Sequence, residues 1–342
     1  VGLLQNTLSA NLPGWQLCPG IRGSFRLERV AAFLWNQWQP WRGIHIVACG
    51  GSDGVSDSST GTLNLAITDA SVDAAKAVVV EFTGVELQHS GGERIDYNFV
   101  DGAGDPEPRK IDLLALTGGT TELLLEDVTL TAGDYSWIRL KVNAERGVID
   151  SYIDLLDDSR HSLYIHSGAN TGLKLNRGFN VPDGGMASFT IDFDLRKSVH
   201  DPSSSEDDYI LRPTLRLVDG NIDGALSGKV TGIENDPGCS DNLESIGAVY
   251  VFETVDTVDD VDGVDDPITS ATVPNDGVYS YTVAFLPEGD YRIDFTCDAD
   301  IDDNAKDADT EVTDGPVDFA GDTVVTITAG KTTMHDFQVP VP

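Results

Sequence analysis

The chain has 342 residues, enough for about two domains at roughly 150 residues each, and 40% of them are hydrophobic, which argues against a largely disordered protein. Its formal net charge is −35, which argues against nucleic-acid binding as a function class, because such a field repels phosphate backbones. The chain contains no run of 18 or more apolar residues, so the sequence predicts no membrane-spanning helix.

Residues 1–48 differ from the rest of the chain, since they hold four Arg against one Glu and four of the five Trp. Arg26 and Arg29 before the apolar segment 30–35 are typical of a secretion signal, but the polar, aromatic segment 36–42 interrupts the pattern. We interpret residues 1–48 as a signal-like leader. Three alternatives stay open: an intact but unusual leader, a mis-started sequence in which residues 1–43 are not native, and an accidental motif at Cys49.

Cys49 follows Val47-Ala48 and precedes Gly50, which resembles a bacterial lipobox, where the Cys becomes the lipidated first residue. Residues 49–61 are then a flexible tether of Gly, Ser and Asp. The resemblance implies a membrane partner reached through a lipid anchor at Cys49. It also implies an outer-membrane location, periplasmic or surface-exposed, because Gly rather than Asp follows the Cys.

Short strands follow one another across residues 62–219, the predicted first domain. Alternating apolar residues predict strands at 63–67, 78–82, 138–142 and 187–195, and Gly84 predicts a β-bulge. Residues 111–116 and 209–218 are each predicted as one further strand, with Pro213 at a sheet edge, whereas 123–128 fits a strand or a short helix. This spacing predicts a sandwich or barrel.

Segments of this region resemble, in order, the domain-of-unknown-function family numbered four-three-eight-two, which occurs in bacterial lipoproteins. They are 63–73, 132–135 with 138–140, 172–175, 192–195 and 211–213. The resemblance implies a surface-anchored β domain. It carries no activity and no site residues.

Residues 224–342 are the predicted second domain. The segment 286–291 feeds a strand with Ile293 and Phe295, and the domain resembles prealbumin-like and carboxypeptidase-regulatory β-sandwiches. We therefore expect an all-β chain of two tandem antiparallel β-sandwiches. Residues 130–135 repeat the spacing of 286–291, which fits either two related sandwiches or shared turn chemistry.

Of the four Cys, only Cys239 and Cys297 remain if Cys49 is lipidated and Cys18 is removed. An even remainder in an exported domain predicts one disulfide, and two reduced, buried thiols are the alternative.

Closely spaced carboxylates make calcium the one cofactor considered, because hard cations prefer oxygen ligands. The candidate ligands are Asp298, Asp300, Asp302 and Asp309, but an EF-hand would need Gly and Glu where Asp303 and Asp309 stand. Two solvated acidic loops are the simpler interpretation.

No nucleophile elbow or zinc-binding motif is present, and His161 and His166 are expected on opposite faces of a strand. Trp137 is the only Trp beyond residue 48, on the face opposite Ile138, and it could serve as a ligand-binding platform with Tyr135 beside it.

The sequence therefore favours a non-enzymatic cell-envelope lipoprotein that acts as a binding or spacer module, with a polysaccharide or an envelope protein as its partner. A carbohydrate-binding module is the alternative, and a secreted hydrolase-type enzyme comes last.

Overall fold

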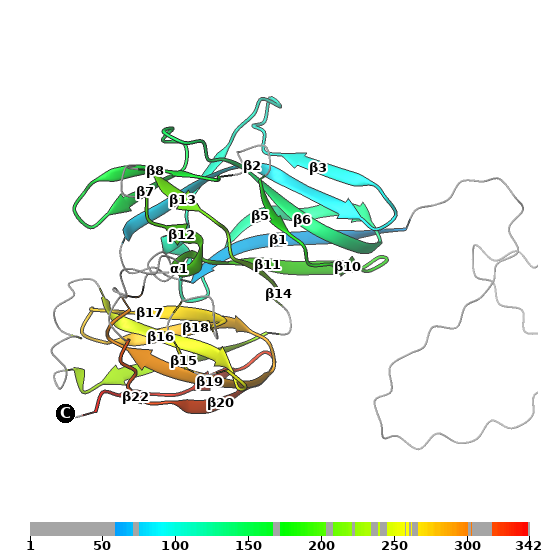
Figure 1. The fold of residues 1–342 in the computed structure, drawn as a ribbon. Coiled ribbons are helices and arrows are strands. Elements are labelled where there is room, and N and C mark those ends of the chain that lie inside the picture. Colours follow the sequence, from blue (N-terminus) through cyan, green and yellow to red (C-terminus); the bar gives the residue numbers. More distant parts are fainter. Residues whose placement is uncertain are drawn as a thin grey trace, which may run out of the picture. The chain divides into compact units, whose positions relative to one another are not determined.

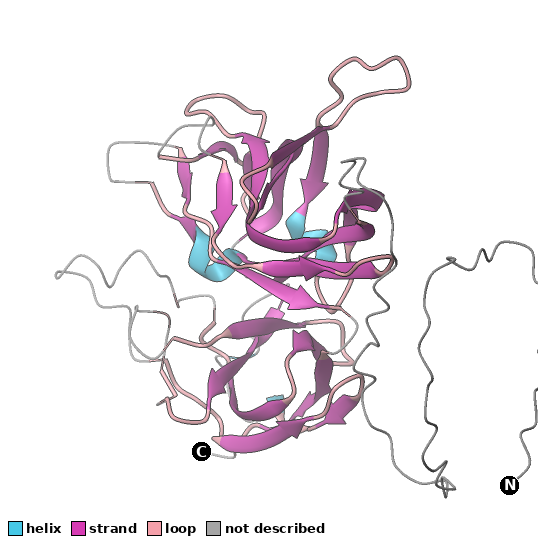
Figure 2. Ribbon diagram, turned by 90° about the vertical axis from the view of Figure 1, so that its right-hand side faces the viewer, coloured by secondary structure: helices cyan, strands magenta, loops and turns pink. Residues whose placement is uncertain are grey.

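The computed structural model describes residues 59–70, 75–166, 172–202, 208–220, 223–233, 239, 245–256, 258–259, 261, 266–299, 302 and 317–340. Strands dominate these residues, and the helical segments among them are short (Figure 2). The predicted all-β class is confirmed. Cys49, the leader and most of the tether lie outside the described residues.

Two sheets form the first sandwich (Figure 1). The smaller sheet has the order β14 (Leu215–Asp219), β11 (Met186–Asp194), β1 (Thr60–Ala70) and β5 (Glu122–Thr131). The larger sheet has the order β10 (Phe179–Val181), β6 (Gly133–Asn143), β2 (Ala75–His89), β7 (Tyr152–Leu155), β8 (Arg160–Tyr164), β13 (Tyr209–Leu211) and β12 (Val199–His200). Beside this path, β3 (Arg94–Asn98) and β4 (Arg109–Asp112) pair with β2, and β9 (Leu173–Leu175) pairs with β6.

One core cluster fills this sandwich, because apolar residues alternate on the strands of both sheets. Its largest fully buried side chains include Phe82 on β2, Tyr135 on β6 and Phe193 on β11. The predicted bulge at Gly84 is confirmed by a register shift between Phe82 and Gly84. A Cβ at Gly84 would lie 2.1 Å from the backbone oxygen of Tyr97, so the close approach of β3 requires glycine there.

The second sandwich also has two sheets. One places β18 (Ser280–Leu286), β15 (Gly224–Thr231) and β21 (Thr332–Met334) in order, with β22 (Phe337–Gln338) also on β15. The other has the order β17 (Thr269–Pro274), β16 (Ser245–Glu253), β19 (Gly289–Thr296) and β20 (Thr323–Ile327). A separate core cluster that includes Val249, Ile293 and Phe295 lies between them.

The sheets are mixed rather than purely antiparallel, which differs from the sequence expectation. β1 pairs in parallel with β11, β8 with β13, and β15 with both β21 and β22. Apolar alternation specifies that a strand has a buried face, but it is the same for parallel and antiparallel neighbours, so the sequence pattern did not reveal these pairings.

Two predicted strands are interrupted. The segment 111–116 is a strand only to Asp112, whose carboxylate accepts hydrogen bonds from the Val78 and Leu114 backbone N–H groups and begins the 3-10 helix η1 (Leu113–Leu116). The segment 209–218 divides at Pro213, which has no N–H to donate. β13 joins the larger sheet of the first sandwich, and β14 joins the smaller one. The ambiguous segment 123–128 belongs to strand β5.

Candidate functional site

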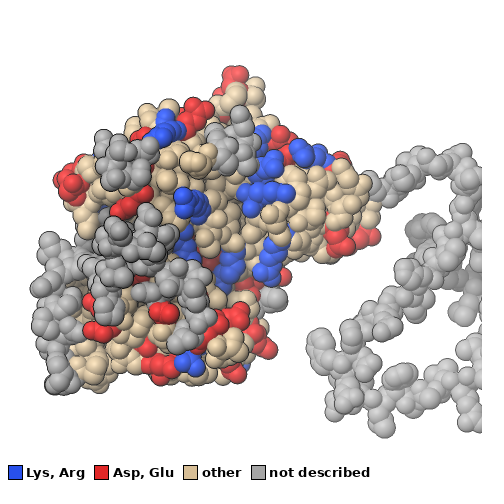
Figure 3. All heavy atoms as spheres, viewed as in Figure 1, with Lys and Arg blue, Asp and Glu red and all other residues tan. Residues whose placement is uncertain are grey.

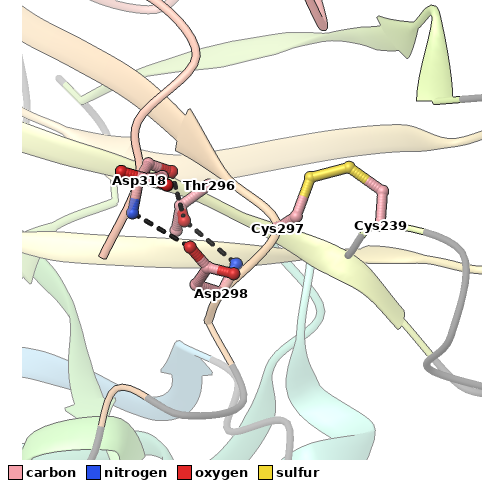
Figure 4. The surroundings of a disulfide bond; sticks show 5 residues. All are labelled: Cys239, Thr296, Cys297, Asp298 and Asp318. Carbon is pink, nitrogen blue, oxygen red and sulfur yellow. Dashed lines mark hydrogen bonds between the residues drawn. A yellow bond between two sulfur atoms is a disulfide. The ribbon is translucent and has the colours of Figure 1, made fainter. Parts of the chain in front are cut away.

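The predicted disulfide joins Cys239 to Cys297 with a Cα–Cα distance of 4.7 Å, and the Cys239 side chain is fully buried (Figure 4). Cys297 directly follows β19. The hydroxyl of Thr296 beside it donates to the backbone oxygen of Asp318 at 2.8 Å, and a carboxylate oxygen of Asp298 accepts from the Asp318 N–H at 2.9 Å. The bridge therefore links the segment after β15 to a hydrogen-bonded corner after β19.

Two of the four predicted calcium ligands, Asp298 and Asp302, lie within the described residues, whereas Asp300 and Asp309 do not. Asp302 is buried, and its carboxylate accepts hydrogen bonds from the Tyr250 hydroxyl and from the Val261 N–H. Within the described ranges, no group of three or more His, Cys, Asp or Glu residues could hold a metal ion. The calcium site stays a prediction.

Trp137 lies half-buried on the outer face of β6, opposite the core residues Ile138 and Leu140. Its ring is surrounded by three cationic groups. The Arg94 and Arg139 guanidinium carbons lie 5.5 and 5.0 Å from the ring centroid, and the Lys174 Nζ lies 4.8 Å from it. Cation–π attraction holds such groups over an indole, so this Trp is surrounded by positive charge.

Sheet register brings these cations together from three strands, β3, β6 and β9, with β2 between β3 and β6. Glu86 on β2 pairs with Asp96 on β3 and with Arg139 on β6, and Arg139 pairs in turn with Lys174 on β9. In the neighbouring row, Gln88 pairs with both Arg94 and Trp137. Side chains that alternate outward on adjacent strands therefore form one charged surface.

Two carboxylates neutralise part of this charge. Glu86, 7% exposed, lies 2.7 Å from Arg139 Nη1 and 3.1 Å from Arg94 Nε, and Asp96 lies 2.8 Å from Lys141 Nζ. Lys174 has no carboxylate partner in the part of the chain that the structure describes. Four cations against two carboxylates leave a formal balance of +2. We call the surface formed by Glu86, Arg94, Asp96, Trp137, Arg139, Lys141 and Lys174 the Trp137 face.

The positive charge of this face contrasts with the charge of the whole chain, which is −35. Figure 3 shows such a separation of charge on the face in view, where Lys and Arg side chains lie toward the middle and Asp and Glu mostly nearer the margins. Because salt screens charges beyond about 8–10 Å, a ligand at the Trp137 face responds mainly to the local cations.

Tyr135, the other predicted platform residue, lies in the core instead. The pairing of β2 with β6 shifts register between Gln88 and His89, so Ser136 is an extra residue and Tyr135 turns to the buried face. Tyr135 is 1% exposed, and its hydroxyl donates to the backbone oxygen of Thr131 at 2.9 Å. Burial, with a smaller contribution from the charge of Glu93, raises the pKa of Tyr135 to about 12.

The repeated segment around this tyrosine is matched in the second sandwich. The Tyr291 hydroxyl donates to the backbone oxygen of Pro287 at 2.9 Å, four residues earlier, as the Tyr135 hydroxyl does to Thr131. After the tyrosine, the core residues of the first sandwich come one position later in the chain than those of the second. The extra residue at the Ser136 bulge explains this difference. Both sandwiches therefore close one corner with the same hydrogen bond.

Sequence reasoning identified Trp137 but missed Arg94 and Lys174. Both lie about 40 residues away from Trp137 in the chain, in the short strands β3 and β9. Alternation of Arg94, Asp96 and Asn98 with Ile95 and Tyr97 was a detectable sign of an outward charged face. This alternation does not show which strand pairs with residues 94–98, or in which register.

Comparisons with known proteins place part of the chain in a family. Residues 60–213 match the family described as "Domain of unknown function (DUF4382)", and the Trp137 face lies entirely within them. The comparison with curated proteins found no match. Within the described residues, no helix is long and apolar enough to cross a membrane.

Among solved structures, the chain is similar to the Bacillus anthracis TIE protein, at 11% identity and a TM-score of 0.19, with 82% of this chain and 34% of that protein covered. The minor pilin GBS52 of Streptococcus agalactiae shows 14% identity and a TM-score of 0.19, with 82% and 97% covered. The major pilin subunit BcpA of Bacillus cereus shows 10% identity and a TM-score of 0.20, with 83% of this chain and 100% of that protein covered. The chain thus spans about a third of the TIE protein, and these TM-scores are too low to establish a shared fold. Residues 60–213 are a DUF4382 domain.

Proposed function

We propose that this protein is a non-enzymatic binding module of the cell envelope whose DUF4382 domain holds an acidic polysaccharide on the Trp137 face. The observation that carries the proposal is the half-buried Trp137 with three cations over its ring. An aromatic plane offers an apolar surface to the C–H groups of a sugar ring. Arg and Lys beside it pair with the carboxylate or sulfate groups that distinguish acidic from neutral glycans.

The arrangement suits a polymer better than a small molecule. The Trp137 face extends across four neighbouring strands, β3, β2, β6 and β9, and strands in a sheet lie about 4.8 Å apart. Lys174, Arg139 and Arg94 therefore offer contacts spread over more than one sugar unit. Lys174, without a carboxylate partner among the described residues, is the cation most available to a ligand.

Export of the protein forms part of the proposal. The Cys239–Cys297 disulfide supports it, because such bonds form and persist in oxidising compartments outside the cytoplasm. A lipid at Cys49 would tether the module to the outer membrane. Intact mass of the protein from its host's membranes is the test: a diacylated or triacylated chain that begins at Cys49 supports the anchor. An unmodified chain that retains residues 1–48 contradicts it.

The glycan proposal is tested by calorimetric titration of the full chain with polygalacturonate, sulfated dextran and neutral dextran at fixed ionic strength. We expect the two acidic polymers to bind and neutral dextran not to. Joint replacement Arg94→Gln and Lys174→Gln removes two charge-assisted contacts and should weaken binding at least about tenfold. Lys229→Gln, an exposed cation on β15 of the second sandwich, is the matched control and should bind like the native chain.

Equal binding of neutral dextran would overturn the acidic specificity and leave a platform for neutral sugars. No binding of any polymer would contradict the proposal and favour a spacer.

A further inference from the structure

A hollow lies on the first sandwich, and its lining contains no residue of the Trp137 face. It is a hollow of about 550 Å³ whose polar lining includes His166, Lys197, His200 and Arg212. Ile165, Leu211 and Pro213 supply apolar lining. Small-molecule sites in proteins have volumes of roughly 300–1,000 Å³ and combine apolar walls with a few convergent polar groups, so the hollow has the size and the composition of such a site.

Neighbouring strand ends bring the four basic residues together. β13 pairs in parallel with β8, which ends two residues before His166, and pairs antiparallel with β12, which carries His200. Lys197 lies on the short helix α1 (Leu195–Ser198) just before β12, and Arg212 follows β13. Residues separated by up to 46 positions in the sequence therefore line one hollow.

The backbone around the hollow is fixed by a buried serine. The Ser198 backbone oxygen accepts a hydrogen bond from the Arg212 N–H at 2.8 Å, and its hydroxyl oxygen accepts one from the Thr214 N–H at 2.8 Å. Ser198 is fully buried. These bonds hold the segment after β13 against α1 independently of the Arg212 side chain, which is exposed.

All the ionisable residues in this lining are bases. Two nearby carboxylates are engaged elsewhere: Asp194 caps α1 through the Lys197 N–H, and Asp208 accepts from the Ser162 hydroxyl and pairs with Arg146. Lys197 is partly neutralised, since its Nζ donates to the Pro267 backbone oxygen and lies 3.5 Å from an Asp266 carboxylate oxygen. Arg212 has no ion-pair partner in the described part of the chain.

We propose that this hollow binds a small organic anion that carries about two or more negative charges on carboxylate or phosphate groups. The Arg212 guanidinium offers a planar fork of donors that matches either group, and Lys197 and the two imidazoles offer further donors around it. Pro213, which is partly exposed, contacts the carbon skeleton. The size of the hollow separates this ligand from the polymer proposed for the Trp137 face.

The test is calorimetric titration of the full chain with citrate, glucose 6-phosphate, inorganic phosphate and neutral glucose, at constant ionic strength. We expect citrate or glucose 6-phosphate to bind and glucose not to. Citrate binding alone identifies carboxylates as the recognised group, and glucose 6-phosphate binding alone identifies phosphate. Inorganic phosphate shows whether the carbon skeleton contributes, because it should bind more weakly than the organic ligand.

Arg212→Gln should weaken binding at least about tenfold, because a charge-assisted hydrogen bond is lost. His166→Gln provides a second, independent variant on another strand. Lys331→Gln, an exposed cation of the second sandwich, and Trp137→Phe should leave binding unchanged, so failure of this site is distinguishable from failure of the Trp137 face. Absence of binding by both organic anions, or equal losses in Arg212→Gln and Lys331→Gln, would overturn the proposal.

Discussion

The two sandwiches use charge in different ways. Residues 60–213 contain 13 Lys and Arg against 26 Asp and Glu, a balance of −13, whereas residues 224–342 contain 4 against 26, a balance of −22. In the first sandwich, cations gather at the Trp137 face and at the hollow near Arg212. The chain has few cations, so their concentration at two surfaces sets these surfaces apart.

The second sandwich has few cations, and its carboxylates accept hydrogen bonds from its own backbone, as Asp112 also does in the first sandwich. Asp276 accepts from the Val278 and Tyr279 N–H groups, and Asp294 accepts from those of Phe295 and Gly321. A carboxylate that accepts backbone hydrogen bonds helps to order a turn without any cation. A covalent bridge at Cys239 adds to these bonds. On the two proposals above, the first sandwich binds ligands and the second has a structural role.

The largest expected effect concerns the disulfide. Replacing Cys239 and Cys297 together by Ser opens a loop with a sequence separation of 58, which should cost the second sandwich about 4 kcal/mol of unfolding free energy on the chain-entropy model. Urea denaturation followed by Tyr fluorescence measures it, and reductant should shift the native chain equally. An unchanged midpoint would contradict a structural role for the bridge.

The stability of the first sandwich should depend on a buried ion pair, as that of the second sandwich depends on its disulfide. Arg216 on β14 lies 2.6 Å from Asp192 on β11, and the Asp192 side chain is 8% exposed. Arg216→Met leaves this carboxylate buried without its cation and should cost about 3 kcal/mol of unfolding free energy. Adding Asp192→Asn should recover part of the loss. Equal destabilisation by the single and double variants would show that the lost charge pairing is not the cause.

The stability of the first sandwich should depend on pH through Asp194. Burial raises the pKa of Asp194 from 3.8 to about 6, although Lys197 opposes the shift. Between pH 4 and 6 the unfolded state loses a proton that the folded state keeps, so stability decreases as pH rises, by about 2 kcal/mol. Asp194→Asn keeps an oxygen for the Lys197 N–H and should remove this contribution. Denaturation of both chains from pH 4 to 7 measures the difference, and parallel curves would contradict the assignment.

The smallest effect tests the feature that the sandwiches share. Tyr135→Phe and Tyr291→Phe each remove one hydroxyl hydrogen bond, worth about 1 kcal/mol. We expect the larger loss for Tyr135, because the Thr131 carbonyl then lies without its partner beside a tyrosine position that is 1% exposed. Thermal denaturation of the two variants compares them. A larger loss for Tyr291→Phe would show that burial of the tyrosine does not determine how much its hydrogen bond contributes to stability.

Much of the fold was predictable from local pattern. Alternating apolar residues located strands such as β1, β6 and β11, and Gly84 marked the bulge. What failed depended on partners far along the chain. Pro213 ends one strand because the chain crosses to the other sheet, and Tyr135 turns inward because Ser136 is extra in the pairing with β2.

The same limit applies to the candidate sites. Trp137 stood out as the single Trp of the folded region, but its cations come from strands that only the sheet register places beside it. The hollow near Arg212 was missed altogether. No periodicity in the sequence relates His166 to His200, because the pairing of β13 with both β8 and β12 brings them together.

The most direct test of the central claim observes Trp137 itself as a ligand binds. The difference in fluorescence between the native chain and Trp137→Phe isolates this indole from the four Trp of residues 1–48. We predict that polygalacturonate shifts the difference spectrum saturably and neutral dextran does not. In a chain that also carries Arg94→Gln and Lys174→Gln, the shift should require at least about tenfold more polymer. A difference spectrum unchanged at saturating polygalacturonate would contradict a ligand-binding role for the Trp137 face.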